Sequence, residues 1–141
     1  MQRFLWVLVA VFGLYAAASI AVDGQWPLAA LVAAAAAVFA WWSSPWKGGR
    51  SLRHREVMAM SEQDRPVVVY WRPGCGFCGR LKAALADRAD DAHWVNIWQD
   101  PEAAAFVRSV NDGNEVVPTV VIDGLPFTNP DPSLVLDRLT A

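Results

Sequence analysis

Cysteine and histidine are scarce in this chain of 141 residues, which has only two of each. Two cysteines argue against a structural disulfide framework, above all in a compartment that keeps thiols reduced. A structural zinc site takes four ligands, and this chain would need Cys75, Cys78, His54 and His93 together. Because the histidines stand far from the cysteines in sequence, we predict no metal site. We expect His54 to be a solvated linker residue and His93 a surface residue of a strand.

Formal charge is missing from two long stretches near the N-terminus. Phe4 to Val22 is 19 residues long, about 28 Å as a helix, which is enough to cross a bilayer. The second stretch, Trp26 to Trp46, is less apolar because alanine fills much of it. Tryptophans stand near the ends of both stretches, as is typical of membrane interfaces. We therefore expect a membrane hairpin over residues 1–46, with helices at about 4–22 and 26–46, rather than two buried helices of a soluble protein.

The distribution of basic residues predicts the orientation of this hairpin. Arg3 precedes the first stretch, whereas the loop between the stretches holds only Asp23. Four more basic residues follow the second stretch: Lys47, Arg50, Arg53 and Arg55. The positive-inside tendency then places both ends in the cytoplasm, with two spans in the cell membrane. Cleavage of the first stretch as a signal peptide, near Ala16–Ser19, would leave this prediction unchanged.

The remainder of the chain divides into a linker and one small domain. Residues 47–64 contain proline, glycine and basic residues, and we interpret them as a basic linker at the membrane surface. From Glu56 onward the chain has 7 basic and 13 acidic residues, which excludes a general nucleic-acid binder. Residues 65–141 form the expected domain, which is small but long enough to fold alone.

Hydrophobic periodicity predicts an α/β order of elements in this domain. We expect strands at Val67 to Trp71, His93 to Trp98, Thr119 to Ile122 and Leu125 to Phe127, and helices at about 77–88, 101–110 and 131–139. The sequence also allows a short helix between Glu56 and Asp64. This strand–helix–strand–helix–strand–strand–helix order matches a minimal thioredoxin fold with a central four-stranded mixed sheet.

The two cysteines form a C-x-x-C pair between the first strand and the first helix of the domain. This is the usual place for thiol–disulfide chemistry. Cys75 would stand at the helix N-terminus, where free N–H groups and the helix dipole favour a thiolate, so we expect it to be the nucleophile. Cys78, one turn later, would be more buried and would resolve the mixed disulfide. Nearby cations, Arg72 above all, should favour the thiolate further, because no acid lies between Val67 and Ala86.

A second candidate element is the segment Val116-Val117-Pro118-Thr119. Proline at the start of a strand cannot donate to the sheet. Together with the upstream cysteines it favours a cis peptide bond at Pro118, although most X–Pro bonds are trans. The backbone of Val117 would then be free to pair with an extended substrate.

Three motifs, WRPGCGFC, VVPTVVIDG and FTNPD, resemble the glutaredoxin family and, within it, the mycoredoxins, which use mycothiol. The resemblance covers residues 65–141 and none of the expected hairpin. It implies that Cys75 attacks, that Cys78 resolves and that Pro118 is cis. It also implies that Thr128, Asn129 and Asp131 help to bind a small thiol. We further assign Arg72, Gly76, Phe77 and Val117 to the expected substrate-binding site.

Two departures from the glutaredoxin pattern leave the exact function open. Gly76-Phe77 replaces the usual Pro-Tyr and approaches the C-G-F-S of monothiol glutaredoxins that bind iron–sulfur clusters. Asn129-Pro130 replaces the usual Gly-Gly, which favours mycothiol over glutathione as the co-substrate, with no tightly bound cofactor. The leading hypothesis is an enzyme that reduces mixed disulfides between a small thiol and protein thiols. The alternatives are a cluster-binding module and a thioredoxin-like dithiol reductase.

Overall fold

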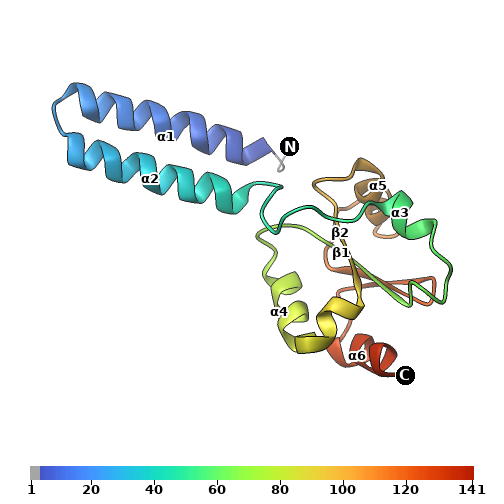
Figure 1. The fold of residues 1–141 in the computed structure, drawn as a ribbon. Helices are drawn as coiled ribbons and strands as arrows, with labels where there is room; N and C mark the ends of the chain where they lie inside the picture. Colours follow the sequence, from blue (N-terminus) through green and yellow to red (C-terminus); the bar gives the residue numbers. More distant parts are fainter. Residues whose placement is uncertain (1–3) are drawn as a thin grey trace. The chain divides into compact units, whose positions relative to one another are not determined.

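A computed structural model describes residues 4–141, which form two compact units. The first unit ends at Gly49 and the second is Arg50–Ala141. Figure 1 shows a pair of helices in the first unit and a sheet with helices in the second. Each unit is described by itself.

The first unit is a hairpin of two antiparallel helices, α1 (Leu5–Val22) and α2 (Trp26–Ser43). Gly24 takes a φ of +79° in the turn that joins them, a conformation that glycine adopts at little cost. Gly13 of α1 faces Ala36 of α2 so closely that a Cβ at residue 13 would lie 2.2 Å from that of Ala36. Close backbone approach through small residues is typical of paired membrane helices.

One of these two helices is long and apolar enough to cross a membrane. It is Trp26–Ser43, with a mean hydropathy of 1.6, whereas the apolar part of α1, Trp6–Val22, is shorter. Two spans were expected, and within residues 4–141 this helix alone is both long enough and apolar enough to be one. The helix also ends three residues before the expected boundary at Trp46, because Ser44 is extended ahead of Pro45.

The second unit is built on a four-stranded mixed sheet, which confirms the predicted thioredoxin-type α/β fold. The strands are β1 (Val67–Trp71), β2 (His93–Asn96), β3 (Thr119–Ile122) and β4 (Leu125–Thr128), in the spatial order β2-β1-β3-β4. β1 runs parallel to β2 and antiparallel to β3, and β3 pairs antiparallel with β4. The expected second strand extended to Trp98, but the chain leaves the sheet at Asn96, whose side-chain oxygen accepts a hydrogen bond from the backbone N–H of Trp98 at 2.9 Å.

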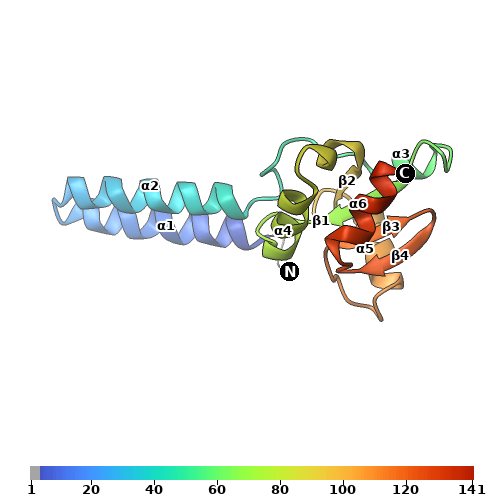
Figure 2. The ribbon, with the colours of Figure 1, turned by 90° about the horizontal axis from the view of Figure 1, so that it is seen from below.

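Helices cover both faces of this sheet, as Figures 1 and 2 show. On one face, Val68 and Tyr70 of β1 pack with α5 (Pro101–Ser109) and α3 (His54–Met58). On the other, Val67 and Val69 pack with α4 (Gly76–Leu85) and α6 (Pro132–Thr140). The alternation follows from the period of two in a strand, and it explains why β1 is apolar at every position from Val67 to Val69.

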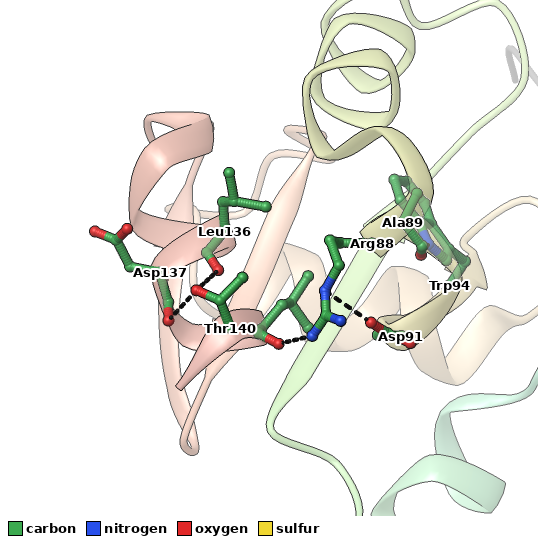
Figure 3. A network of polar contacts seen from close by, with 8 residues as sticks. Arg88, Ala89, Asp91, Trp94, Leu136, Asp137 and Thr140 are labelled. Atoms are coloured by element: carbon green, nitrogen blue, oxygen red, sulfur yellow. Dashed lines mark hydrogen bonds and ion pairs between the residues drawn. The ribbon is translucent and has the colours of Figure 1, made fainter.

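The helix after the cysteines is shorter than predicted. α4 ends at Leu85, and Ala86–Asp91 form a 3-10 turn, η2, in place of the last helical turn expected up to Arg88. Figure 3 shows the contacts around η2. The guanidinium group of Arg88 donates to the carbonyl of Leu139 in α6 and lies 3.1 Å from the carboxylate of Asp91. The indole of Trp94 donates to the carbonyl of Ala89 at 2.7 Å. These contacts join η2 to both β2 and α6.

The middle of the expected linker is part of the folded unit. We call Ser51–Met58 the strap. Leu52 forms a parallel bridge with Val95 of β2, and Val57 is fully buried in the core between β1 and α5. The short helix expected between Glu56 and Asp64 exists, but it covers His54–Met58. The linker interpretation is therefore wrong for the strap, because a buried valine and a sheet bridge fix it to the domain.

His54 was expected to be solvated, and this prediction is also wrong. Its Nδ1 lies 2.7 Å from the hydroxyl of Tyr70, and its ring stacks on Phe106 with centres 5.1 Å apart. Its backbone N–H donates to Asp100 at 2.6 Å. Tyr70 is fully buried, and burial raises the pKa of its hydroxyl well above the ordinary value. His54 thus supplies a hydrogen-bond partner to the hydroxyl of Tyr70, which burial removes from water.

Candidate active site

The cysteine pair lies where β1 leads into α4. Gly74, with a φ of +77°, turns the chain after β1, and Cys75 is the N-cap residue of α4. Its Sγ accepts a hydrogen bond from the backbone N–H of Cys78 at 3.2 Å, one of the N–H groups that lack a partner within the helix. The helix N-terminus therefore points one of its donors at the sulfur of Cys75, as the sequence predicted.

The two sulfurs lie in different surroundings. Cys75 is partly exposed, whereas Cys78 is only 3 % exposed, and both are free thiols. Burial, reinforced by a hydrogen bond and a charge interaction with the sulfur of Cys75, raises the pKa of Cys78 far above its usual value. A reagent or substrate can thus reach Cys75 first, and Cys78 stays protonated beneath it.

The backbone of Val117 lies beside the reactive sulfur. The Val117–Pro118 peptide bond is cis, which confirms the prediction. The carbonyl oxygen of Val117 is 3.4 Å from Sγ of Cys75, although the two residues are 42 positions apart. A substrate that reaches Cys75 must therefore also meet the Val117–Pro118 backbone.

Basic and aromatic side chains flank the cysteine pair. The Arg72 guanidinium lies 5.9 Å from the ring centre of Trp98, and that of Arg80 lies 4.3 Å from the ring centre of Phe77. The Phe77 side chain is exposed, and Gly76 beside it has open space where a side chain would stand. Arg72 acts on Cys78, because its backbone hydrogen bond and its charge partly offset the rise in the pKa of that thiol.

The residues expected to bind a small thiol are engaged in contacts of their own. The hydroxyl of Thr128 donates to the side chain of Asn111, and the backbone N–H of Asn129 donates to the carbonyl of Pro118 at 2.8 Å. Asp131 caps α6, and its hydrogen bonds from Ser133 lower the pKa of its carboxyl. Asn129 alone of the three bonds directly to the Val117–Pro118 segment.

Two further residues near the site had been assigned only to secondary structure. Trp98 was placed in a strand, yet it packs against the same core cluster as Cys75 and lies under Arg72. Asn111 follows the helix that was expected up to about residue 110, and its side chain is buried among Val107, Thr119 and Thr128. A local pattern gave no signal for either role, because their partners come from other elements.

The histidines lie apart from the cysteines in the contacts they make. His54 bonds to Tyr70, and Nε2 of His93 lies 2.8 Å from the carbonyl oxygen of Asp64. Within residues 4–141, no three His, Cys, Asp or Glu side chains are grouped so that they could hold a metal ion.

Comparisons with known proteins assign the family. Residues 67–126 match the family model of glutaredoxin. A protein of Mycobacterium tuberculosis named "Putative glutaredoxin" is 42 % identical over 74 residues, which cover 52 % of this chain and 88 % of the relative. Mycoredoxin 1 of Corynebacterium glutamicum is 38 % identical over 76 residues, covering 53 % of this chain and 94 % of the relative. With the C-x-x-C pair at the start of α4, these similarities establish that the chain belongs to the glutaredoxin family and is a thiol–disulfide oxidoreductase.

Proposed function

We propose that this enzyme reduces mixed disulfides between a low-molecular-weight thiol and protein thiols, with mycothiol as its co-substrate in preference to glutathione. The observation that carries the proposal is the asymmetry of the cysteine pair, in which an accessible Cys75 accepts a helix N–H while Cys78 is buried beneath it. Similarity to Mycoredoxin 1 and the Asn129-Pro130 sequence support mycothiol.

The reaction begins when the Cys75 thiolate attacks the small-thiol sulfur of the mixed disulfide. The bond between the two substrate sulfurs breaks, and the target protein leaves as a thiolate that takes a proton from water. Cys75 now carries the small thiol in a disulfide. The N–H of Cys78, which points at Sγ of Cys75, stabilises negative charge on that sulfur before the attack and when it leaves again.

Cys75 is regenerated in one of two ways. A second small thiol, as its thiolate, attacks the bound small thiol, so that Cys75 leaves as a thiolate and the small thiol becomes its own symmetric disulfide. Alternatively, Cys78 loses its proton, attacks Sγ of Cys75 and releases the small thiol, leaving a Cys75–Cys78 disulfide. The second route requires a two-electron thiol reductant afterwards. Because burial raises the pKa of Cys78, we assign the first route to ordinary turnover.

The roles of the two cysteines can be tested by substitution. Cys75→Ser should abolish turnover of a mixed disulfide between mycothiol and a cysteine-containing peptide, whereas Cys78→Ser should retain part of it. Running the same assay with glutathione in place of mycothiol, and with a thioredoxin reductase system as donor, identifies the electron donor. Full activity of Cys75→Ser would refute the proposal, and equal rates with glutathione would refute the preference for mycothiol.

We also propose that the hairpin holds the enzyme in the cell membrane through two spans, with the catalytic unit facing the cytoplasm. The apolar α2, the close packing of Gly13 against Ala36 and the basic residues after Ser43 support this arrangement. Protease treatment of right-side-out and inverted vesicles tests it, because only inverted vesicles should lose the catalytic unit.

A further inference from the structure

We propose that Asn111 is a positioning residue that fixes the Val117–Pro118 backbone beside the nucleophile, Cys75. The inference rests on the proposed function only in taking Val117–Pro118 as the backbone that a disulfide substrate meets. It concerns a buried side chain to which neither the sequence motifs nor the proposed reaction assigns a role. The argument starts from the hydrogen bonds of that side chain.

Asn111 is 8 % exposed and is bonded on both ends of its amide. Nδ2 donates to the carbonyl of Val107, at 2.7 Å, and to the hydroxyl of Thr119, at 3.0 Å. Oδ1 accepts from the hydroxyl of Thr128. The Val107 carbonyl can only accept, so it fixes which end of the amide faces it, and the two hydroxyl groups adapt.

The first branch of this network reaches the residue before Val117. Thr119 is fully buried, and its hydroxyl, which accepts from Asn111, donates in turn to the carbonyl of Val116 at 2.8 Å. Asn111 thus sets the donor-to-acceptor direction of this series of hydrogen bonds, and the hydroxyl of Thr119 continues it to the carbonyl of Val116. Removing that hydroxyl would leave both the amide of Asn111 and the carbonyl of Val116 without this partner.

The second branch reaches the residue after Val117. Thr128 is the last residue of β4, and its bond to Asn111 holds the point at which the chain leaves the sheet. The next residue, Asn129, has a φ of +46° and donates its N–H to the carbonyl of Pro118 at 2.8 Å. The carbonyls of Val116 and Pro118 are therefore both held by groups linked to Asn111, and the Val117 carbonyl between them faces Sγ of Cys75 at 3.4 Å.

The Asn111 network should therefore affect the affinity for substrate and leave the reactivity of Cys75 unchanged. Asn111 contacts neither cysteine in the bonds described, so loosening its network should leave the reactivity of Cys75 intact. It should instead make the position of the Val117–Pro118 backbone, on which an extended substrate docks, less well defined. Losing one hydrogen bond of ordinary strength corresponds to about a fivefold change in an equilibrium, so we expect KM to rise about fivefold to tenfold while kcat changes little.

The test uses Thr119→Val and Thr128→Val in the full chain, because each removes one hydroxyl with little change of shape. Thr140→Val is the matched control, since the hydroxyl of Thr140 bonds only to carbonyls within α6. Two quantities are measured: KM and kcat for the mycothiol–peptide mixed disulfide, and the rate at which iodoacetamide, which needs no docking, alkylates Cys75. Both threonine variants should raise KM, with alkylation as in the unmodified chain and in Thr140→Val.

Three results would overturn the inference. One is a KM in both threonine variants equal to that of Thr140→Val. Another is a parallel loss of turnover and alkylation in a protein that still melts cooperatively, which would indicate general structural damage. The third is failure of both variants to fold, which would make the network a determinant of stability rather than of position. If the unmodified chain itself did not reduce the mixed disulfide, the proposed function would fail instead, and the two failures are thus distinguishable.

Discussion

The strap can be tested through Val57, whose side chain is fully buried between β1 and α5 although the residue belongs to a segment whose sequence resembles a linker. Val57→Ala removes two methyl groups from this core. Each buried carbon contributes about 0.8 kcal/mol, so the transfer loss is about 1.6 kcal/mol, and the cavity left behind brings the total to about 2 kcal/mol. A solvated linker residue would change the free energy of unfolding by less than about 0.5 kcal/mol.

A thermal melt distinguishes a buried Val57 from a solvated one. A loss of about 2 kcal/mol lowers the Tm of a domain of this size by roughly 10 °C. We would follow the full chain in detergent by near-ultraviolet circular dichroism, with Val107→Ala as a buried comparison and Val116→Ala as an exposed one. Val57→Ala should behave like Val107→Ala. A Tm within 2 °C of Val116→Ala would show that the strap is not part of the core, and the reasoning would be wrong.

Two further predictions concern the cysteines and the hairpin. Because burial raises the pKa of Cys78, this thiol should stay protonated in the folded state through pH 9, so mass spectrometry after iodoacetamide treatment at pH 7 to 9 should find one adduct on the native chain and two on the denatured chain. Equal labelling of both cysteines in the native chain would contradict this. In the hairpin, Gly13→Val should force α1 and α2 apart, because even a Cβ there would lie 2.2 Å from that of Ala36. In an SDS titration followed by tryptophan fluorescence, Gly13→Val should unfold at a lower SDS concentration than the control Ala30→Val, which changes an exposed position. An equal unfolding midpoint for the two variants would argue against the close approach.

The sequence was informative wherever a signal lies within a few neighbouring residues. The β-branched run before Pro73 and the C-x-x-C pair each depend on adjacent positions, and β1 and the place of Cys75 at the N-terminus of a helix were predicted from them. The cis bond at Pro118 was predicted from a local proline signal read together with the upstream cysteines. Asp123-Gly124, between the two expected strands, is a hairpin signal of the same local kind, and both residues have positive φ in the β3–β4 turn.

The features that were missed depend on contacts between distant residues. His54 finds its partners in Tyr70, Asp100 and Phe106, which are 16 to 52 positions away, and nothing near it in sequence distinguishes it from a solvated histidine. Asn111 occupies a turn, yet its side chain points into the core because hydroxyl groups from two strands meet it there. Such roles arise only when the fold brings the partners together.

The margins of the sheet have a consequence for how copies of this enzyme coexist. The outermost strand, β2, would offer its unpaired backbone to any other extended chain, but the hydroxyl of Ser51 donates to the Trp94 carbonyl and accepts from the Asn96 N–H, at 3.1 and 2.7 Å. At the opposite margin, Pro126 of β4 has no N–H to give. Neither edge strand is an open template for strand addition, so we expect no edge-to-edge pairing of sheets between copies at high concentration.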